Sequence, residues 1–255
     1  MNRFAQIKHT FSTVGATYDT HAVVQRLVAQ RLAEKVQGKP NAKGCVLEVG
    51  CGTGLLSTHL VPQAQTYLLT DVALPLLERA WRKVADQPHV VPLVVDGERL
   101  CFTASFDLIV ANLALHWFQD PKAAIGRLVA SLKPGGELYL TVCGNNSLHE
   151  WRMAHHVAEA PCGVLDFPSF GQFKEWFPLT GKRHVEEEWV TFKPENALSF
   201  LRSLKGMGSH LAHPGHTPLP PQSLRKVMQV FDEDPQVSCQ ILYGYYQKPE
   251  KMREE

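Results

Sequence analysis

The sequence lacks three features that would place a chain in a membrane, on a nucleic acid or in an oxidising compartment. No stretch of its 255 residues approaches the roughly 20 apolar residues of a membrane-spanning helix. The 26 Lys and Arg residues nearly balance the 25 Asp and Glu residues, so the overall charge favours neither nucleic acid nor an anionic membrane as a partner. The six cysteines include no C-x-x-C pair, and the stretch MNRFAQIKHTFSTVG has no apolar core of the signal-peptide type. We therefore expect a cytoplasmic protein with reduced thiols.

Short apolar runs are present instead, and they alternate with longer helical patterns over the first 145 residues. The runs that are typical of strands buried on both faces are 45–49, 66–70, 90–95, 106–112 and 137–143. The segments that show apolar residues at helical spacing are 55–61, 74–86 and 121–133, the last one stopped by Pro134-Gly135-Gly136. This alternation predicts an α/β fold with a doubly wound, largely parallel sheet.

The remaining segments are expected to elaborate this sheet within one domain, residues 1–255. The expected parts are a helical lid (1–40), a ligand-binding core (41–145), helical and loop insertions that cover the substrate (146–182 and 194–232) and two last strands (183–193 and 236–247).

The strongest functional motif is EVGCGTG at 48–54, at the end of the first predicted strand. Glycines there allow a sharp turn and a close approach of a ligand to the backbone. Dinucleotide folds use G-x-G-x-x-G and hold a pyrophosphate on a helix N-terminus. Here Glu48 stands two residues before the first glycine, where it would oppose a phosphate but suits a ligand with an ammonium group and a sulfonium. A nicotinamide or flavin site and an ordinary strand–helix turn are the alternatives.

Two further acids follow the next two predicted strands. Asp71 ends the second strand, 17 residues after Gly54, where a carboxylate can accept hydrogen bonds from both hydroxyls of a ribose. Asp96 ends the third strand, and a side chain there reaches the edge of an adenine. Either acid alone would more often be a helix cap. Three acids at the carboxyl ends of consecutive strands form a much more specific set.

The EVGCGTG turn, Asp71, Asp96-Gly97 and the ANLALHW run together resemble the class I S-adenosylmethionine-dependent methyltransferases over residues 45–145. The resemblance implies a Rossmann-like, seven-stranded sheet whose final strand inserts antiparallel beside the fifth. It implies S-adenosylmethionine as cofactor, S-adenosylhomocysteine as product and a lid that closes over the site. The candidate cofactor-binding residues are Gln25, Glu48, Gly50, Cys51, Gly52, Gly54, Leu55, Asp71, Val72, Asp96, Gly97, Glu98, Asn112, Leu113 and His116.

Three segments extend the resemblance over nearly the whole chain. FSTVGATYDTHAVVQ, LALHW and LRSLKGMGSH are similar to the malonyl-[acyl-carrier protein] O-methyltransferases of biotin synthesis. That family methylates the free carboxylate of a malonyl thioester, so the implied partner is an acyl carrier protein that bears a malonyl group. The trans-aconitate methyltransferases, which esterify a free small acid, share the fourth-strand run. A non-catalytic cofactor-binding subunit is a further alternative, which the intact turn and its acids disfavour.

Methylation of a carboxylate needs no general base, because a carboxyl group with a pKa near ~4 is ionised at neutral pH. It needs orientation, a dry pocket and a group that holds the second carboxylate oxygen. The candidates for this work are Tyr18, His21, Trp117, Arg202 and Lys205. Tyr18 could donate to the carboxylate, and Arg202 or Lys205 could bind it or a phosphate on the carrier's arm. The alternatives are a packing Tyr18, a core Trp117, a surface His116 and a solvated basic face for Arg202 and Lys205.

Several other residues are expected to have no role in the site. His210, His213 and His216 repeat at metal-like spacing, but their Gly/Pro loop has no Cys and no nearby acid, so we expect no metal site. The residues expected on the surface are His155, His156, Arg79, Arg82 and Lys83. The cysteines expected to be buried beside apolar runs are Cys45, Cys101 and Cys143.

Overall fold

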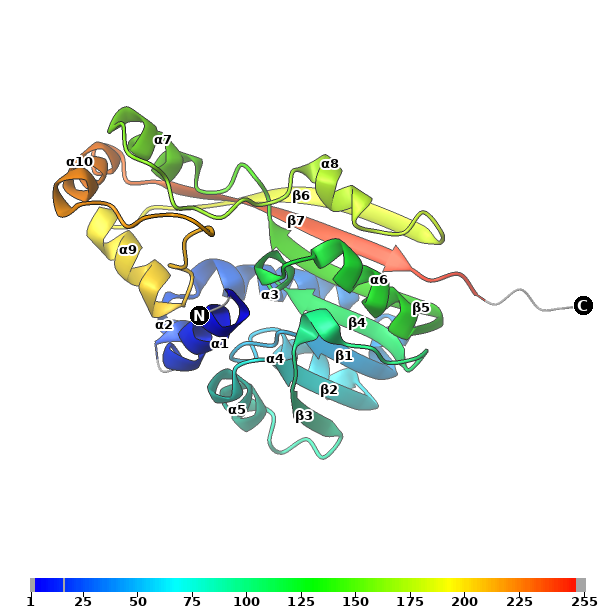
Figure 1. Cartoon of the computed structure of the whole chain (residues 1–255). Coiled ribbons are helices and arrows are strands. Elements are labelled where there is room, and N and C mark those ends of the chain that lie inside the picture. Colours follow the sequence, from blue (N-terminus) through cyan, green and yellow to red (C-terminus); the bar gives the residue numbers. More distant parts are fainter. Residues whose placement is uncertain (1–2, 16, 251–255) are drawn as a thin grey trace, which may run out of the picture.

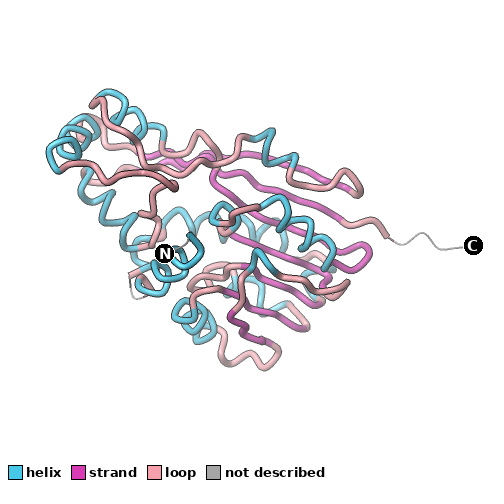
Figure 2. The backbone as a smooth tube through the Cα atoms, viewed as in Figure 1, coloured by secondary structure: helices cyan, strands magenta, loops and turns pink. Residues whose placement is uncertain are grey.

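A seven-stranded sheet runs through the molecule (Figures 1 and 2). The computed structural model describes residues 3–15 and 17–250, so residues 1, 2, 16 and 251–255 of the predicted domain lie outside the described part. The strands are β1 (Cys45–Val49), β2 (Thr66–Asp71), β3 (Val90–Val94), β4 (Phe106–Asn112), β5 (Leu132–Cys143), β6 (Lys182–Phe192) and β7 (Val237–Gln247). Their order is β3-β2-β1-β4-β5-β7-β6, and β7 is antiparallel to both of its neighbours. The predicted fold class is therefore confirmed, including the antiparallel last strand beside the fifth.

The first four strands end at the same edge of the sheet. Glu48 of β1 is level with Leu69 of β2 and with Val110 of β4, and Asp71 of β2 is level with Val94 of β3. Parallel strands in register bring their carboxyl ends together, so the segments after β1, β2, β3 and β4 converge there. Such an edge is where ligands bind in doubly wound sheets.

Helices cover both faces of the sheet, because side chains alternate along each buried strand. One face packs against α3 (Val23–Val36), α4 (Ser57–Leu60) and α5 (Leu74–Lys83). The other packs against α6 (Pro121–Ser131) and α8 (Phe170–Glu175). Within β1, Val46 belongs to the first core and Leu47 to the second. Among the described residues no helix is long and apolar enough to cross a membrane.

The predicted N-terminal lid divides into two parts. Helices α1 (Arg3–Thr13) and α2 (Tyr18–His21) lie over the carboxyl edge of the sheet, as Figure 1 shows. Helix α3 instead belongs to the core, because Val28, Leu32 and Val36 along its inner face are fully buried. The apolar spacing that suggested a lid helix is thus the spacing of a sheet-covering helix.

Only some helices of the predicted insertions cover the carboxyl edge of the sheet. A roof over the same edge is formed by α7 (His149–Val157), α9 (Ala197–Gly206) and α10 (Pro221–Phe231), which lie together in Figure 1. An aromatic cluster joins them: Phe200 stacks on Phe231 at 5.6 Å between ring centroids, and Trp151 meets both rings edge-on. Helix α8 does not cover the site. It packs on the far face of the sheet through the fully buried Phe173.

One predicted boundary is wrong. Helix α6 ends at Ser131 and β5 begins at Leu132, so the Pro134-Gly135-Gly136 turn lies inside the strand and not before it. The strand accommodates the turn through a register shift against β4. A Cβ at residue 136 would lie 3.0 Å from the carbonyl oxygen of Phe106, so only glycine lets the two strands approach there.

We predict that Phe231→Ala destabilises the protein by about 3–5 kcal/mol, because it removes a buried ring that holds the roof helices together. Urea unfolding checks the change, with Leu179→Ala as control, since Leu179 is 81% exposed and should cost less than about 0.5 kcal/mol. An unchanged midpoint for Phe231→Ala would show that the aromatic cluster does not support the fold.

Candidate active site

The glycine turn after β1 has positive φ angles, which residues with a side chain rarely adopt. Gly50, Gly52 and Gly54 have φ angles of 67°, 56° and 85°. A Cβ on Gly54 would lie 2.9 Å from the Cα of Ala80, and one on Gly50 would lie 2.7 Å from the Cβ of Ala114. The turn therefore packs tightly between α5 and the loop after β4, and its backbone forms part of a cavity wall.

The Asp71 carboxylate holds this turn in place. Its Oδ2 accepts a hydrogen bond from the backbone N–H of Gly52 at 2.8 Å, and its Oδ1 accepts one from the N–H of Ala73, also at 2.8 Å. Burial raises the pKa of Asp71, although these two backbone donors act in the opposite direction. A carboxylate has more than two acceptor positions, so both oxygens can still accept from a ligand.

Glu48 lies beneath the turn in a small pocket beside the main cavity. The pocket is also lined by Tyr18, Gln25 and Asn112. The carboxylate is 1% exposed and accepts hydrogen bonds from the Ser57 hydroxyl at 2.6 Å and the Tyr67 hydroxyl at 2.7 Å. Burial raises the pKa of Glu48 to about 7, against the lowering effect of the two hydroxyls.

The lid is anchored to the turn through Asp19, which sequence reasoning missed. Its carboxylate accepts hydrogen bonds from the Thr53 hydroxyl within the turn and from Lys83 Nζ of α5, the latter at 2.7 Å. Burial alone would raise the pKa of Asp19, but the hydrogen bonds from Lys83 and Thr53 lower it overall. Lys83 is therefore not the free surface cation that the sequence suggested. The only sign of this role in the sequence was the position of Asp19 directly after Tyr18, in the TYDTH run.

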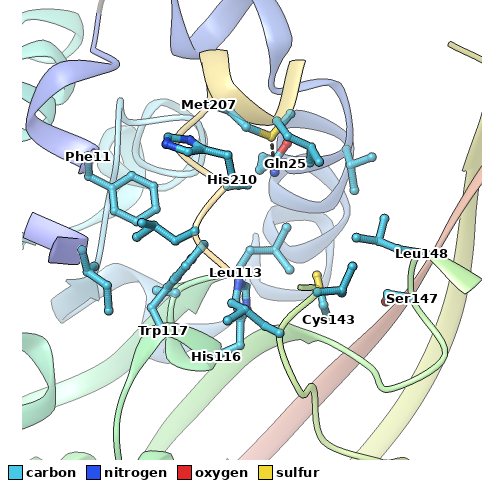
Figure 3. Close-up of a pocket in the computed structure, with 18 of the residues that line it drawn as sticks. Phe11, Gln25, Leu113, His116, Trp117, Cys143, Ser147, Leu148, Met207 and His210 are labelled. Carbon is cyan, nitrogen blue, oxygen red and sulfur yellow. Dashed lines mark hydrogen bonds between the residues drawn. The ribbon is translucent and has the colours of Figure 1, made fainter. Parts of the chain in front are cut away.

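The loop after β4 is fixed by side-chain hydrogen bonds. Asn112 donates from Nδ2 to the carbonyl of Gln25 at 3.2 Å and accepts at Oδ1 from the Thr141 hydroxyl at 2.9 Å. Leu113 has a φ of 51°, and its N–H donates to the same hydroxyl at 2.9 Å. A short 3-10 helix, Leu115–Trp117, then directs His116 and Trp117 into the cavity (Figure 3).

These elements enclose one cavity of about 630 Å³. The residues that line its end at the sheet edge include Gly50, Gly52, Asp71, Val72, Asp96, Gly97 and Asn112. The residues that line its other end are largely apolar and come from the lid and roof, among them Phe11, Trp151, Phe192, Phe200, Leu204, Met207, Leu219 and Leu224. No Lys or Arg of the described residues lines the cavity. The arrangement joins an acidic, backbone-rich end to an apolar chamber.

Most of the sequence-predicted residues come together here. The candidates that line the cavity are Tyr18, His21, Gln25, Gly50, Gly52, Asp71, Val72, Asp96, Gly97, Glu98, Asn112, Leu113, His116 and Trp117. Glu48, Cys51 and Leu55 line the small adjoining pocket, and Gly54 lines neither. Contact of these residues with a ligand stays a prediction.

Arg202 and Lys205 are not brought into the cavity, which contradicts their expected contact with a substrate carboxylate. Both are exposed on the outer side of α9. Phe200, Leu201 and Leu204 of the helix line the cavity, together with Met207 directly after its end. The three-residue spacing placed the two cations on one face correctly, but the apolar positions determine which face turns inward.

Two smaller expectations are also wrong, and one alternative is excluded. The alternative of a surface His116 is excluded, since its ring is enclosed by Trp117 and Phe167. His155 is 5% exposed and its Nδ1 lies 3.0 Å from the carbonyl oxygen of Pro161. Cys101 is exposed rather than buried.

Glu98 also has a structural role, since its carboxylate accepts hydrogen bonds from the N–H groups of Gln119 and Asp120 at 3.0 and 2.7 Å. It thereby fixes the loop before α6, although the residue also lines the cavity. His210 and His216 line the cavity and His213 does not, and the described residues contain no cluster of three or more potential metal ligands.

Comparison with known proteins gives a consistent picture. A family model described as a methyltransferase domain matches residues 18–187. The chain is 32% identical over 252 residues to a malonyl-[acyl-carrier protein] O-methyltransferase from Magnetococcus marinus, covering 96% of this chain and 93% of that protein. It is 34% identical over 248 residues to the biotin biosynthesis bifunctional protein BioCD from Bordetella avium, covering 95% of this chain and 52% of that protein.

Solved structures support the fold. The YcgJ protein from Bacillus subtilis matches with a TM-score of 0.64 at 14% identity, over 88% of this chain and 99% of that one. The N-methyltransferase NodS from Bradyrhizobium japonicum, in complex with S-adenosylhomocysteine, matches with a TM-score of 0.54 at 16% identity, over 90% and 88% of the two chains.

We predict that Glu48→Gln stabilises the ligand-free protein at pH 8 by about 2.5 kcal/mol more than at pH 5. The folded-state pKa of about 7 exceeds the ordinary value of 4.5, so folding favours the protonated carboxyl. The wild type therefore loses stability as pH rises from 4.5 to 7, and an amide, which does not titrate, removes that loss. Urea unfolding of both proteins at the two pH values checks this. Equal differences at both would show that Glu48 does not titrate abnormally.

Proposed function

The chain belongs to the methyltransferase-domain family, and on this premise we propose that it transfers a methyl group from S-adenosylmethionine to the free carboxylate of a malonyl thioester. The thioester would be carried by an acyl carrier protein, and the reaction would serve an early step of biotin synthesis, as the names of the related proteins suggest. We place the reaction in the cytoplasm, since all six thiols are free and a reducing compartment would keep them so.

The residues at the sheet edge fit S-adenosylmethionine. The ammonium group of its amino-acid end suits the small pocket, where Glu48 has a buried carboxylate and Gln25 has a buried Oε1 without a hydrogen-bond partner among the described residues. Asp71 is available to the ribose hydroxyls and Asp96 to the adenine edge. The bound group supplies an electrophilic methyl on a sulfonium, and the acids on this side favour that positive charge.

The observation that carries the choice of acceptor is the absence of Lys and Arg from the described lining of the cavity. A free polycarboxylate such as trans-aconitate would need several cations to replace its hydration. A malonyl thioester has one carboxylate and an otherwise neutral body, which suits the apolar chamber formed by the lid and roof. The wall residues therefore favour a thioester over a free polyacid.

The chemistry requires little from the protein. A carboxylate oxygen attacks the methyl carbon, the carbon–sulfur bond breaks with its electron pair going to sulfur, and a methyl ester and S-adenosylhomocysteine form without proton transfer. The lid and roof exclude water, and the enclosure orients the carboxylate. Burial, together with the charges of Asp71 and Asp19, raises the pKa of Tyr18. Its hydroxyl therefore keeps its proton and acts as a donor where the acidic end of the cavity meets the apolar chamber.

We predict that purified protein transfers labelled methyl groups from S-adenosylmethionine to malonyl-loaded carrier protein and, less efficiently, to malonyl-coenzyme A. It should not methylate trans-aconitate, for the electrostatic reason above. Mass spectrometry of the product should locate the methyl group on the malonyl carboxylate. Methylation of aconitate in preference to both thioesters would overturn the proposed acceptor, and failure of calorimetric titration to detect S-adenosylmethionine binding would overturn the proposed cofactor.

The outer surface of the roof suits an acidic partner. Arg202 and Lys205 on α9 and Arg225 and Lys226 on α10 are exposed, and none of the four forms an ion pair with a described residue. Neither helix contains an acidic residue. Since their inner sides line the acceptor chamber, a carrier protein with an acidic surface would dock here beside the chamber that receives its arm.

We predict that Arg202→Glu/Lys205→Glu lowers kcat/KM for malonyl carrier protein at least tenfold at low salt and weakens its salt dependence. Turnover of malonyl-coenzyme A at saturation should change little, because neither residue contacts the cavity. Lys174→Glu/Lys182→Glu makes the same change of net charge on the exposed surface near α8 and serves as the matched control. Equal effects of the two double variants would place the carrier elsewhere.

A further inference from the structure

His116 is held in a position that leaves one ring nitrogen available to the acceptor chamber. Its ring lies 5.4 Å from that of Trp117 and 5.5 Å from that of Phe167, between ring centroids. Nδ1 is buried and has no hydrogen-bond partner among the described residues. Figure 3 shows His116 beside Trp117 on one wall, with Met207 and His210 across the cavity.

The protonation state of the ring follows from this enclosure. Burial lowers the pKa of His116 to about 4, so the ring is neutral at physiological pH and has a single N–H. A buried N–H without an acceptor costs more than an unpaired lone pair in most proteins. The proton is therefore favoured on Nε2, while Nδ1, the buried nitrogen, keeps the lone pair.

Three other polar side chains around the chamber are already directed at groups of the protein. The Ser147 hydroxyl donates to the carbonyl of Gln240 at 3.0 Å, and the Ser203 hydroxyl donates to the carbonyl of Ser199 at 3.0 Å. The amide of Gln25 is directed at the sulfur of Met207, 3.2 Å away. His116 is thus an enclosed donor without an assigned acceptor, in a chamber whose described lining has no cation.

We infer that His116 binds the carboxylate of the methyl acceptor, donating one N–H to the oxygen that does not attack. This rests on the proposed function, and it assigns His116 to the acceptor and not to the cofactor. A neutral donor orients the carboxylate through a charge-assisted hydrogen bond but leaves its negative charge in place. The second oxygen therefore keeps its nucleophilicity, which a full cation at the same place would reduce. No proton is transferred, and the imidazole is unchanged after the reaction.

The test compares His116→Phe, which keeps a planar ring without a donor, with His116→Gln, which keeps a donor. We expect His116→Phe to lower kcat/KM for malonyl-coenzyme A roughly 10- to 100-fold, the range for loss of a hydrogen bond to a charged group. His116→Gln should recover most of this loss. Affinity for S-adenosylmethionine, measured by calorimetry, should stay within about twofold in both variants. His156→Phe on the exposed side of α7 is the matched control and should behave as wild type.

Three outcomes would overturn the inference. If His116→Phe weakens S-adenosylmethionine binding as much as it lowers kcat/KM, the residue belongs to the cofactor. If it turns over malonyl-coenzyme A as the wild type does, or if His116→Gln is as impaired as His116→Phe, the ring serves only packing. A wild type that binds S-adenosylmethionine but methylates no malonyl thioester would instead overturn the proposed function itself.

Discussion

The two hydrogen bonds that Asp71 accepts are the constraint on which the site depends. The bond from Gly52 joins the end of β2 to the left-handed turn after β1, and the bond from Ala73 fixes the carboxylate within the turn that follows β2. The turn after β1 also packs on α5 through Gly54. Thr53 of the turn donates a hydrogen bond to Asp19 of the lid, and Lys83 of α5 donates another to the same carboxylate. The lid, the turn and a core helix are thereby connected through buried or half-buried polar contacts rather than through lid packing alone. The carboxylate that we propose for the ribose hydroxyls thus also fixes the walls of the cavity.

Charges are distributed unevenly over the walls of the cavity. Acids gather at the sheet edge, where Glu48, Asp71 and Asp96 lie within or beside the cavity, and the described lining includes no Lys or Arg. Such a site favours a cation at one end. An anionic acceptor must then be held by neutral donors, with apolar walls from Phe200 and Leu204 excluding water. The cations of α9 stand on the outside of the same roof, where they can act on a partner in solution.

The sequence was sufficient for features that depend on neighbouring residues. The strand pattern and the EVGCGTG turn predicted the sheet and the edge at which Asp71 and Asp96 meet, because parallel strands bring their carboxyl ends together. The sequence did not predict features that depend on packing between segments far apart in the chain. Arg202 and Lys205 face outward since α9 turns its apolar side to the chamber, and α3 joins the core because the sheet needs a cover there. Asp19 and His116 depend on partners far along the chain, Lys83 and Phe167, so no local pattern could reveal their surroundings.

The contrast between the acidic edge and the cation-free chamber has a consequence for turnover. Before methyl transfer the two reactants have opposite charges at their reacting atoms: the acids suit the sulfonium, and neutral donors hold the carboxylate. Transfer neutralises both charges at once, leaving a thioether and an ester. The wall then faces two products whose attraction to it has weakened at the point of reaction, so the reaction itself removes an electrostatic reason for the products to stay. The same charge distribution that favours binding of the reactants would therefore also speed the release of the products.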